Sequence, residues 1–288
     1  MNKGVTSAFP EAPKDKFGWP WTVDSIERDS IEKAEKYVWP KISIITPSFN
    51  QGDYIEETIR SVLLQNYPNI EYIVIDGGST DCTCEILKKY DPWIKYWHSE
   101  RDGGQGNALN QGFSIATGEI LGWINSDDLY FPDCFKKIAR CIVERKAEFV
   151  YGDSVTIDEG GKWIKYEKGN LVLDRYLAFG GLISSHTAFW QSAIHVPVLE
   201  SLHCAMDYEL WRRLVPGKRR MHVKTPLGMF RLQDASKSCN EKFKAAWAAD
   251  DKEIERIYPS TLKKSRVRAR EFSLVQKSYK FFNRSNSI

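Results

Sequence analysis

Long hydrophobic runs are missing from this 288-residue sequence, and cysteine is scarce. No segment approaches the roughly 18 apolar residues of a membrane-spanning helix, and the N-terminus lacks the apolar centre of a signal peptide. The six cysteines form no CxxC pair and are too sparse for a secreted disulfide scaffold. We therefore expect a cytoplasmic protein with reduced thiols.

Several nucleotide and metal motifs are also absent. The sequence has no Walker A loop and no HExxH pair among its five histidines. The glycines at 103, 104 and 106 lack the GxGxxG spacing of a dinucleotide site and follow the third predicted strand rather than the first. These absences argue against a nicotinamide-dependent dehydrogenase. His186 precedes a predicted strand, and we expect it to have a packing or surface role.

The composition is that of a folded globular protein, with 42% hydrophobic and 27% charged residues. The net charge is only +3, but it is unevenly distributed. Between residues 259 and 288, eight Lys or Arg residues stand against Glu271 alone. This asymmetry indicates an appendage that meets an anionic surface, and it argues against a nucleic-acid-binding body.

Short buried strands alternate with helices from residue 41 onward. Apolar runs predict strands over 42–46, 70–75, 94–98 and 120–124, each followed by a helix. This alternation predicts an α/β fold with a mostly parallel sheet flanked by helices. Further along, the patterns predict a hairpin over 149–157 and 163–167, a strand over 187–190 and a helix over 207–214. Residues 1–40 form an N-terminal extension, and residues 239–288 form a helical, basic tail.

Small, acidic and amide residues follow four successive predicted strands. Glycines let a backbone approach a ligand closely, and acidic side chains can hydrogen-bond ribose hydroxyls or base N–H groups. Because ligands of such sheets bind where the strands end, the loops should line one crevice. Together the loops predict a nucleotide ligand, although each loop alone could be a helix cap or a solvated turn. The four loops are 46–50, 76–78, 102–104 and 125–128.

Asp127 and Asp128 are the sharpest feature of these loops. Adjacent carboxylates repel each other unless donors or a cation neutralise them. Mg²⁺ and Mn²⁺ prefer oxygen ligands and commonly lie between one or two carboxylates and a substrate diphosphate. The pair therefore indicates a divalent metal site. The alternative is that one of the two acids caps the helix predicted to begin near Pro132.

Five motifs in this order resemble family 2 glycosyltransferases of the GT-A fold. They are IITPSFNQ at 44–51, VIDGGSTD at 74–81, the segment 102–112, TGE at 117–119 and NSDD at 125–128. The resemblance covers about residues 41–238, with a nucleotide-binding half at 41–130 and an acceptor half at 131–238. It implies inverting transfer of a sugar, of the hexosyl type, from a UDP-sugar with Mn²⁺ or Mg²⁺. The acceptor would be a carbohydrate or a lipid-linked molecule of cell-envelope polysaccharide or glycolipid biosynthesis.

The resemblance also implies roles for residues on the nucleotide side. Thr46 and Pro47 would border the nucleoside, and Asp76 with Gly77 would bind the uracil or ribose edge. Asp102 would lie along the nucleotide pocket.

On the metal side, Asp127 would meet ribose or metal and Asp128 the metal. Asn125 stands where many relatives have a first acid, which leaves one fewer charge for the cation. Gln233 replaces a histidine that can contact metal or diphosphate, and Gln is the poorer ligand. Arg231 is either a diphosphate contact or a structural ion-pair partner.

The segment DYELW at 207–211 resembles the part of this family that carries the general base, with Met206 in the usual Glu position. The resemblance makes Asp207 the base. Asp207 opens a predicted helix, where the helix dipole lowers the pKa of a carboxylate. A helix cap is the alternative role.

The tail carries an apolar stripe at helical spacing with basic neighbours, at Phe272, Val275, Tyr279 and Phe282. Residues 262–284 would then either contact anionic lipid at the inner face of the membrane or dock on the protein itself. Two rival functions stay open beside the transferase. One is a non-catalytic nucleotide-sugar-binding protein, and the other is a glycoside hydrolase that uses two carboxylates.

Overall fold

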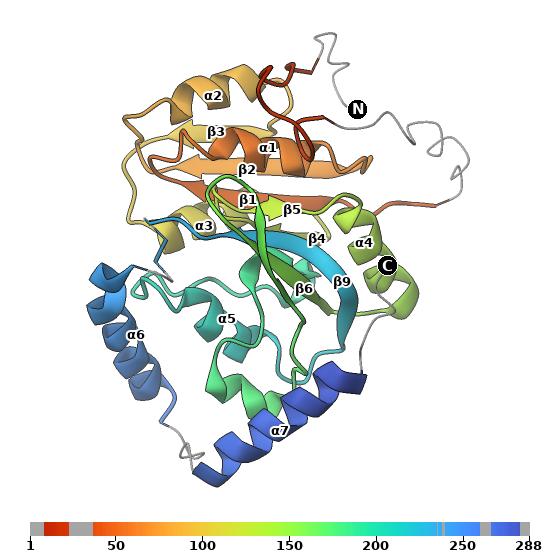
Figure 1. Ribbon diagram of the computed structural model, residues 1–288, viewed down its shortest axis with the longest axis vertical. Coiled ribbons are helices and arrows are strands. Elements are labelled where there is room, and N and C mark those ends of the chain that lie inside the picture. Colours follow the sequence, from red (N-terminus) through yellow and green to blue (C-terminus); the bar gives the residue numbers. More distant parts are fainter. Residues whose placement is uncertain (1–8, 23–36, 235, 238–239, 260–265, 283–288) are drawn as a thin grey trace.

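The structure is a computed structural model that describes residues 9–22, 37–234, 236–237, 240–259 and 266–282. In the last of these segments the side chains are described from Arg270 to Lys280. The expected transferase domain at 41–238 therefore lies almost entirely within the described part. Figure 1 shows the first strands and α2 at one end of the molecule and α6 and α7 at the other.

The first four long strands form a parallel sheet. They are β1 (Ile42–Ser48), β2 (Ile70–Asp76), β3 (Tyr96–Ser99) and β4 (Ile120–Trp123). The connecting helices are α1 (Ile55–Leu63), α2 (Thr83–Tyr90) and α3 (Gln105–Ile115). The predicted strand and helix order of this half is confirmed, with ends shifted by one or two residues.

Successive side chains of β1 point to opposite faces of the sheet, so the strand contributes to two hydrophobic cores. Ile42 and Ile44 pack into the core that includes α1, α2 and α4 (Cys134–Arg145). Ile45 points to the other face, where it packs with Leu109 and Phe113 of α3. Both faces are covered, as expected for a parallel sheet flanked by helices, and the one polar residue among the first four, Ser43, donates a hydrogen bond to Glu71.

The second half of the sheet is mixed. The strand order is β3-β2-β1-β4-β8-β6-β9-β5, with β8 (Ala188–Gln191) antiparallel to both β4 and β6 (Phe149–Ile157). The predicted hairpin of β6 and β7 (Trp163–Glu167) is confirmed. The sequence patterns did not indicate β9 (Arg220–Arg231), which runs parallel to β6 and pairs with the two-residue strand β5 (Leu129–Tyr130). Its sequence has no continuous apolar run and contains Pro226, which is unusual within a strand.

The remaining helices are α5 (Met206–Leu214), α6 (Lys244–Ile257) and α7 (Arg266–Phe282), with short 3-10 turns η2 (Asp174–Phe179), η3 (Ser185–Thr187), η4 (Ser192–Ile194) and η5 (Glu241–Phe243). Among the helices that the structure describes, none combines the length and the apolar character needed to cross a bilayer.

Part of the N-terminal extension is held by one buried arginine. Arg60 of α1 is only 4% exposed, and its guanidinium donates hydrogen bonds to the carbonyls of Pro10, Pro20 and Trp21. It also donates to Tyr90 Oη of α2. A buried cation needs such acceptors, so this contact fixes residues 10–21 against the first two helices.

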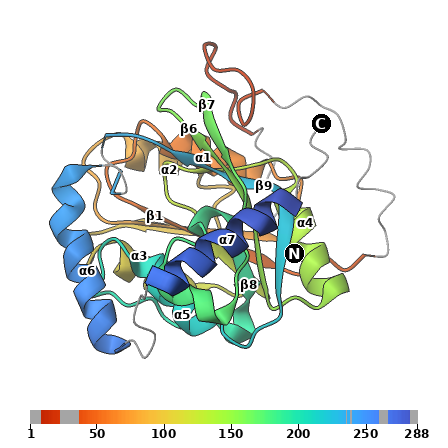
Figure 2. The same ribbon diagram turned by 60° about the horizontal axis from the view of Figure 1, so that its bottom comes forward.

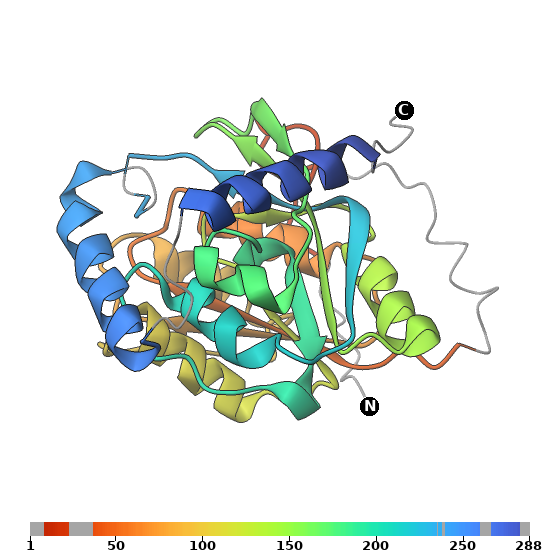
Figure 3. The ribbon, with the colours of Figure 1, turned by 90° about the horizontal axis from the view of Figure 1, so that it is seen from below.

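The tail helix docks on the protein itself. Figures 2 and 3 show α7 lying across η2, where Phe272 stacks on Phe179 with ring centroids 4.9 Å apart. Gln276 is buried, donates to Leu171 O at 2.8 Å and accepts from Leu171 N at 2.7 Å. The described part of the apolar stripe therefore packs against this chain. The side chain of Phe282 lies outside the described residues.

This docking predicts a stability difference along α7. Phe272→Ala removes an aromatic contact with η2, so we expect the free energy of unfolding to fall by about 1–3 kcal/mol. Leu274→Ala on the same helix is the matched control, because Leu274 is 65% exposed, and it should change stability by less than about 0.5 kcal/mol. Urea unfolding of both variants measures this, and equal effects would contradict the docked arrangement.

Candidate active site

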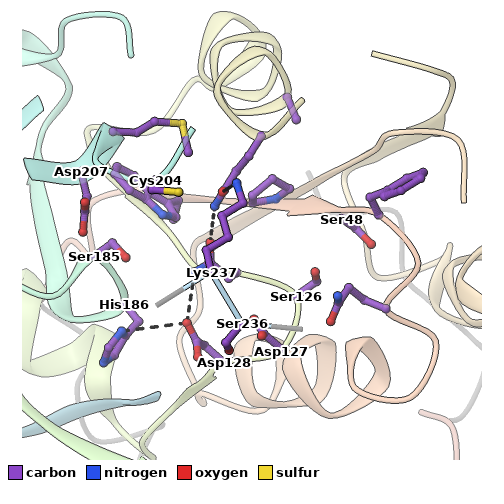
Figure 4. A pocket seen from close by; sticks show the side chains of 18 of the residues that line it. Ser48, Ser126, Asp127, Asp128, Ser185, His186, Cys204, Asp207, Ser236 and Lys237 are labelled. Carbon is purple, nitrogen blue, oxygen red and sulfur yellow. Dashed lines mark hydrogen bonds and ion pairs between the residues drawn. The ribbon is translucent and has the colours of Figure 1, made fainter. Parts of the chain in front are cut away.

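A large cavity lies where the carboxyl ends of β1, β2 and β4 meet. Its volume is about 1260 Å³, enough for a nucleotide sugar. The loops predicted to line one crevice all contribute to its wall. The site residues placed on the wall are Pro47, Gly77, Asp102, Asp127, Asp128, Asp207 and Gln233. Figure 4 shows Asp127 and Asp128 near Ser236, and Asp207 near Ser185 and Cys204.

Of the acid pair in this wall, Asp128 is buried and Asp127 is half-buried. Asp128 is 0% exposed, and burial together with the neighbouring Asp127 carboxylate raises the pKa of Asp128 well above its ordinary value. Burial also raises the pKa of Asp127. Helix α4 begins at Cys134, after Asp133, so neither acid of the pair caps it. The alternative of a capping role is therefore wrong.

The acid pair accepts hydrogen bonds from the end of β9, from the residue Gln233 just beyond it and from Asn125. The Arg231 backbone N–H donates to Asp128 Oδ1 at 3.0 Å, and Asn125 Nδ2 donates to Asp128 Oδ2 at 3.3 Å. Gln233 lies just beyond the strand, and its Nε2 donates to Asp127 Oδ2 at 2.5 Å. Gln233 is thus beside the acid pair, where the resemblance implied it would be.

The side chain of Arg231 turns away from the cavity. It is 1% exposed and forms an ion pair with Glu57 at 2.5 Å. Its other donors reach the carbonyls of Asp127, Asp158 and Glu159 at 2.7–3.2 Å. Of the two roles left open for Arg231, these contacts are those of a structural ion-pair partner rather than of a diphosphate ligand.

Two residues expected on the nucleotide side lie behind the cavity wall. Thr46 is 0% exposed and accepts a hydrogen bond from Tyr72 at 3.1 Å. Asp76 is also 0% exposed, and its carboxylate accepts from Ser79 and Ser99. Neither side chain lines the cavity. The next residues in the chain, Pro47 and Gly77, do line the cavity. In these two loops, Pro47 and Gly77 rather than Thr46 and Asp76 would therefore contact a ligand.

Asp207 lies in the first turn of α5, half-buried in the cavity wall. Burial raises the pKa of its carboxyl to about 6. The helix dipole, which we expected to lower this pKa, is outweighed by the loss of solvent. The N-cap of α5 is Ala205, so Asp207 does not cap the helix.

The start of α5 is held from outside the helix by Asp250 of α6. Asp250 is 2% exposed, and its Oδ2 accepts the backbone N–H groups of His203, Cys204 and Ala205 at 2.6–3.0 Å. This carboxylate satisfies donors that a helix start otherwise leaves unpaired. The sequence contains no signal for this contact, because the two segments lie 45 residues apart.

The structure adds two polar residues to the site that the sequence patterns did not single out. His186 is 5% exposed and lies in the wall beside Asp128, and burial lowers its pKa to about 4. His186 is therefore packed in the interior, but it also faces the acid pair, which the sequence did not indicate. Lys237 projects into the cavity, and its Nζ donates to Gln105 Oε1 and to His203 O, both at 2.8 Å. The position of Lys237 close to Arg231 and Gln233 in the sequence was its only signal.

The same fold occurs in solved glycosyltransferase structures. The structure of S. aureus TarS 1-349 in complex with UDP-GlcNAc matches with a TM-score of 0.61 at 19% identity, over 85% of this chain and 76% of that chain. The mannosyltransferase PcManGT from Pyrobaculum calidifontis, in complex with GDP-Man and Mn²⁺, matches with a TM-score of 0.56 at 16% identity, over 79% of this chain and 69% of that chain. The fold is therefore the GT-A α/β fold.

Sequence comparison identifies the family. Residues 43–211 match the sequence model of glycosyl transferase family 2, and this chain belongs to that family. An uncharacterized glycosyltransferase of Rickettsia felis is 32% identical over 194 residues, which cover 61% of this chain and 31% of that protein. Glycosyltransferase GlyG of Streptococcus pneumoniae is 30% identical over 154 residues, 52% of this chain and 51% of that protein. The chain thus spans about 31% of the length of the first of these relatives and about half of the second.

The raised pKa of Asp207 predicts a stability effect with a defined sign. Its folded pKa of about 6 exceeds the value of about 3.9 in unfolded chains, so its ionisation destabilises the fold. The cost is complete above pH 6 and absent below pH 4. We expect Asp207→Asn to raise the free energy of unfolding by about 1–3 kcal/mol at pH 8.

The gain should shrink as the pH falls from 6 towards 4, which urea unfolding at several pH values measures. Asp234→Asn is the control, because Asp234 is exposed and its substitution should give a small difference at every pH. A gain for Asp207→Asn that does not vary with pH would contradict the buried, proton-binding carboxyl.

Proposed function

We propose that the protein is an inverting glycosyltransferase that moves a sugar from a UDP-sugar to an acceptor hydroxyl. The observation that carries this proposal is that one cavity contains both the carboxyl of Asp207 and the acid pair of half-buried Asp127 and buried Asp128. Inverting transfer needs a base at the attacking hydroxyl and a separate site that stabilises charge on the leaving diphosphate.

Asp207 is the proposed base. A pKa of about 6 leaves the carboxylate largely ionised at neutral pH and makes it a stronger proton acceptor than an ordinary Asp. It would take the proton of the acceptor hydroxyl as that oxygen attacks the sugar carbon on the side opposite the leaving diphosphate. Asp250 and α6 hold the helix that presents it.

The other end of the cavity suits a diphosphate. Asp127 and Asp128 are hard oxygen ligands whose carboxylates have no Lys or Arg side chain as a partner among the described residues. They fit a divalent cation, Mn²⁺ or Mg²⁺. Such a cation would supply positive charge for the departing phosphate. Lys237, whose ammonium lies in the same wall, takes the diphosphate role that we first considered for Arg231.

The comparisons support the donor class more closely than the acceptor. TarS binds UDP-GlcNAc in a structure of the same fold, and PcManGT holds GDP-Man with Mn²⁺. We assign nucleotide binding to residues 41–130 and acceptor binding to residues 131–238. The tail completes the site, because Lys242, Phe243 and Trp247 also line the cavity. The acceptor that we propose is a carbohydrate or lipid-linked glycan, and the exposed Arg270 and Lys277 of α7 would face an anionic membrane.

Replacement of the base tests the mechanism. Asp207→Asn keeps the shape of the side chain but cannot accept a proton, so we expect kcat to fall by about 10²–10⁴-fold with little change in donor affinity. In the wild type, kcat/KM should fall as the pH drops below about 6, because protonated Asp207 is inactive. The assay follows UDP release from a panel of UDP-sugars with Mn²⁺ and candidate glycan acceptors.

Asp234→Asn controls for the loss of one exposed carboxylate and should retain activity. Release of free sugar without an acceptor would favour the hydrolase. Donor binding without turnover on any acceptor of the panel would favour the non-catalytic binder. Full activity of Asp207→Asn would exclude Asp207 as the base.

Substitutions of the two basic residues near Gln233, Lys237 and Arg231, should have different effects on donor binding and on stability. Lys237→Ala should raise the KM for the donor about tenfold or more without lowering thermal stability, since it removes a charged contact worth about 1.5–3 kcal/mol. Arg231→Met should instead destabilise the fold by about 3 kcal/mol, because it leaves Glu57 and three carbonyls without their donor. Donor kinetics and urea unfolding of both variants check this, and the reverse pattern would restore Arg231 as the diphosphate contact.

A further inference from the structure

His186 and Asp128 face each other in the cavity wall. Nδ1 of His186 lies 4.0 Å from Asp128 Oδ2 (Figure 4), which is too far for a hydrogen bond. The other ring nitrogen, Nε2, lies 2.6 Å from Ser154 Oγ of β6. The imidazole thus has one nitrogen bound to the protein and one directed at the acid pair.

The strand β9 holds the ring in this orientation. Phe230 stacks on His186 with ring centroids 5.9 Å apart and an interplanar angle of 22°. Gly228 lies against His186, where an added Cβ would clash with the backbone carbonyl oxygen of His186 and would be 2.8 Å from Cδ2 of its ring. Any side chain at 228 would displace the imidazole, so the glycine makes room for it.

We propose that His186 is the nitrogen ligand of the divalent cation that binds with the donor. This inference rests on the proposed function, because phosphate oxygens of the nucleotide would complete the coordination. Nδ1 and Asp128 Oδ2 lie 4.0 Å apart, within the span of two metal–ligand bonds of about 2.0–2.2 Å each, so both would be able to hold the same ion. Gln233 is occupied with Asp127.

The surroundings of His186 match those of a ligating histidine. Such residues usually donate the N–H of their second nitrogen to a fixed acceptor, which sets the tautomer and the ring orientation. With the proton on Nε2, Ser154 Oγ at 2.6 Å would be that acceptor, which would leave the lone pair of Nδ1 for the ion. Among the described residues no three His, Cys, Asp or Glu side chains form a ready-made metal site. The proposed site accordingly has two protein ligands, His186 and Asp128, and forms with the nucleotide.

A nitrogen ligand changes the preference among metals. Imidazole suits Co²⁺, Ni²⁺ and Zn²⁺, whereas a site of carboxylates and phosphates alone suits Mg²⁺. His186→Asn should therefore raise the Kd for Co²⁺ in the presence of UDP by about tenfold or more and the Kd for Mg²⁺ by much less. A residue that only positions Asp128 would weaken both metals alike.

The direct test is pulsed electron paramagnetic resonance of Mn²⁺ bound with UDP to the full chain. We expect the wild type to show the ¹⁴N modulation of a directly bound imidazole, and His186→Asn to lose it. His203→Asn, an exposed histidine outside the cavity wall, should keep it. Ser154→Ala retains the imidazole and should bind Mn²⁺ about tenfold more weakly.

The outcomes separate the two proposals. If Mn²⁺ and UDP bind but the wild type shows no ¹⁴N modulation, or if His186→Asn retains it, the role of His186 is wrong and the transferase proposal stands. If the wild type binds no Mn²⁺ with UDP, the proposed function fails and this inference fails with it. The wild-type spectrum decides the question even if His186→Asn does not fold.

Discussion

The cost of burying the Asp128 carboxylate is the constraint on which the site depends. A buried carboxylate needs hydrogen-bond donors or a cation, and here the donors are one backbone N–H of β9 and one amide of the same loop. The N–H is available because β9 pairs with the two-residue strand β5 and then ends. The Arg231 side chain fixes that end through Glu57 and three carbonyls. The ion pair between Arg231 and Glu57, which lie 174 residues apart in the sequence, thus helps to fix the position of the acid pair.

The two chemical tasks of the proposed reaction belong to two parts of the sheet. The parallel half ends in the loops that border the nucleotide, and the mixed half brings β9, η3 and α5 to the same cavity. One stacked pair joins the parts directly, because Trp123 at the end of β4 lies on Trp211 of α5 with centroids 5.4 Å apart. The helix that carries Asp207 is therefore packed against the strand that leads into the acid pair, so the distance between base and acid pair does not depend on loops alone.

Much of the fold follows from the sequence, because β1, β2 and β4 are rich in apolar residues and buried along nearly their whole length, and turn and helix signals separate them. The strand β9 could not be predicted in this way, since the exposed residues Lys224 and Thr225 and the following Pro226 interrupt its apolar residues. The acid pair and Asp207 were found from the order of the motifs. Their environments were not, because desolvation depends on the segments packed around them. Burial reversed the expected direction of the pKa of Asp207, and His186 reaches the site only because β8 lies beside β4.

The contact between Asp250 and the start of α5 has a consequence for how the chain can vary. The family match ends at residue 211, yet the carboxylate that accepts the backbone N–H groups of Cys204 and Ala205, just before α5, lies beyond it. Two chains with the same motifs up to that point can therefore differ in how firmly the helix that carries Asp207, the proposed base, is held. Exchange of the C-terminal segment between relatives would then alter turnover while every signature residue stayed in place.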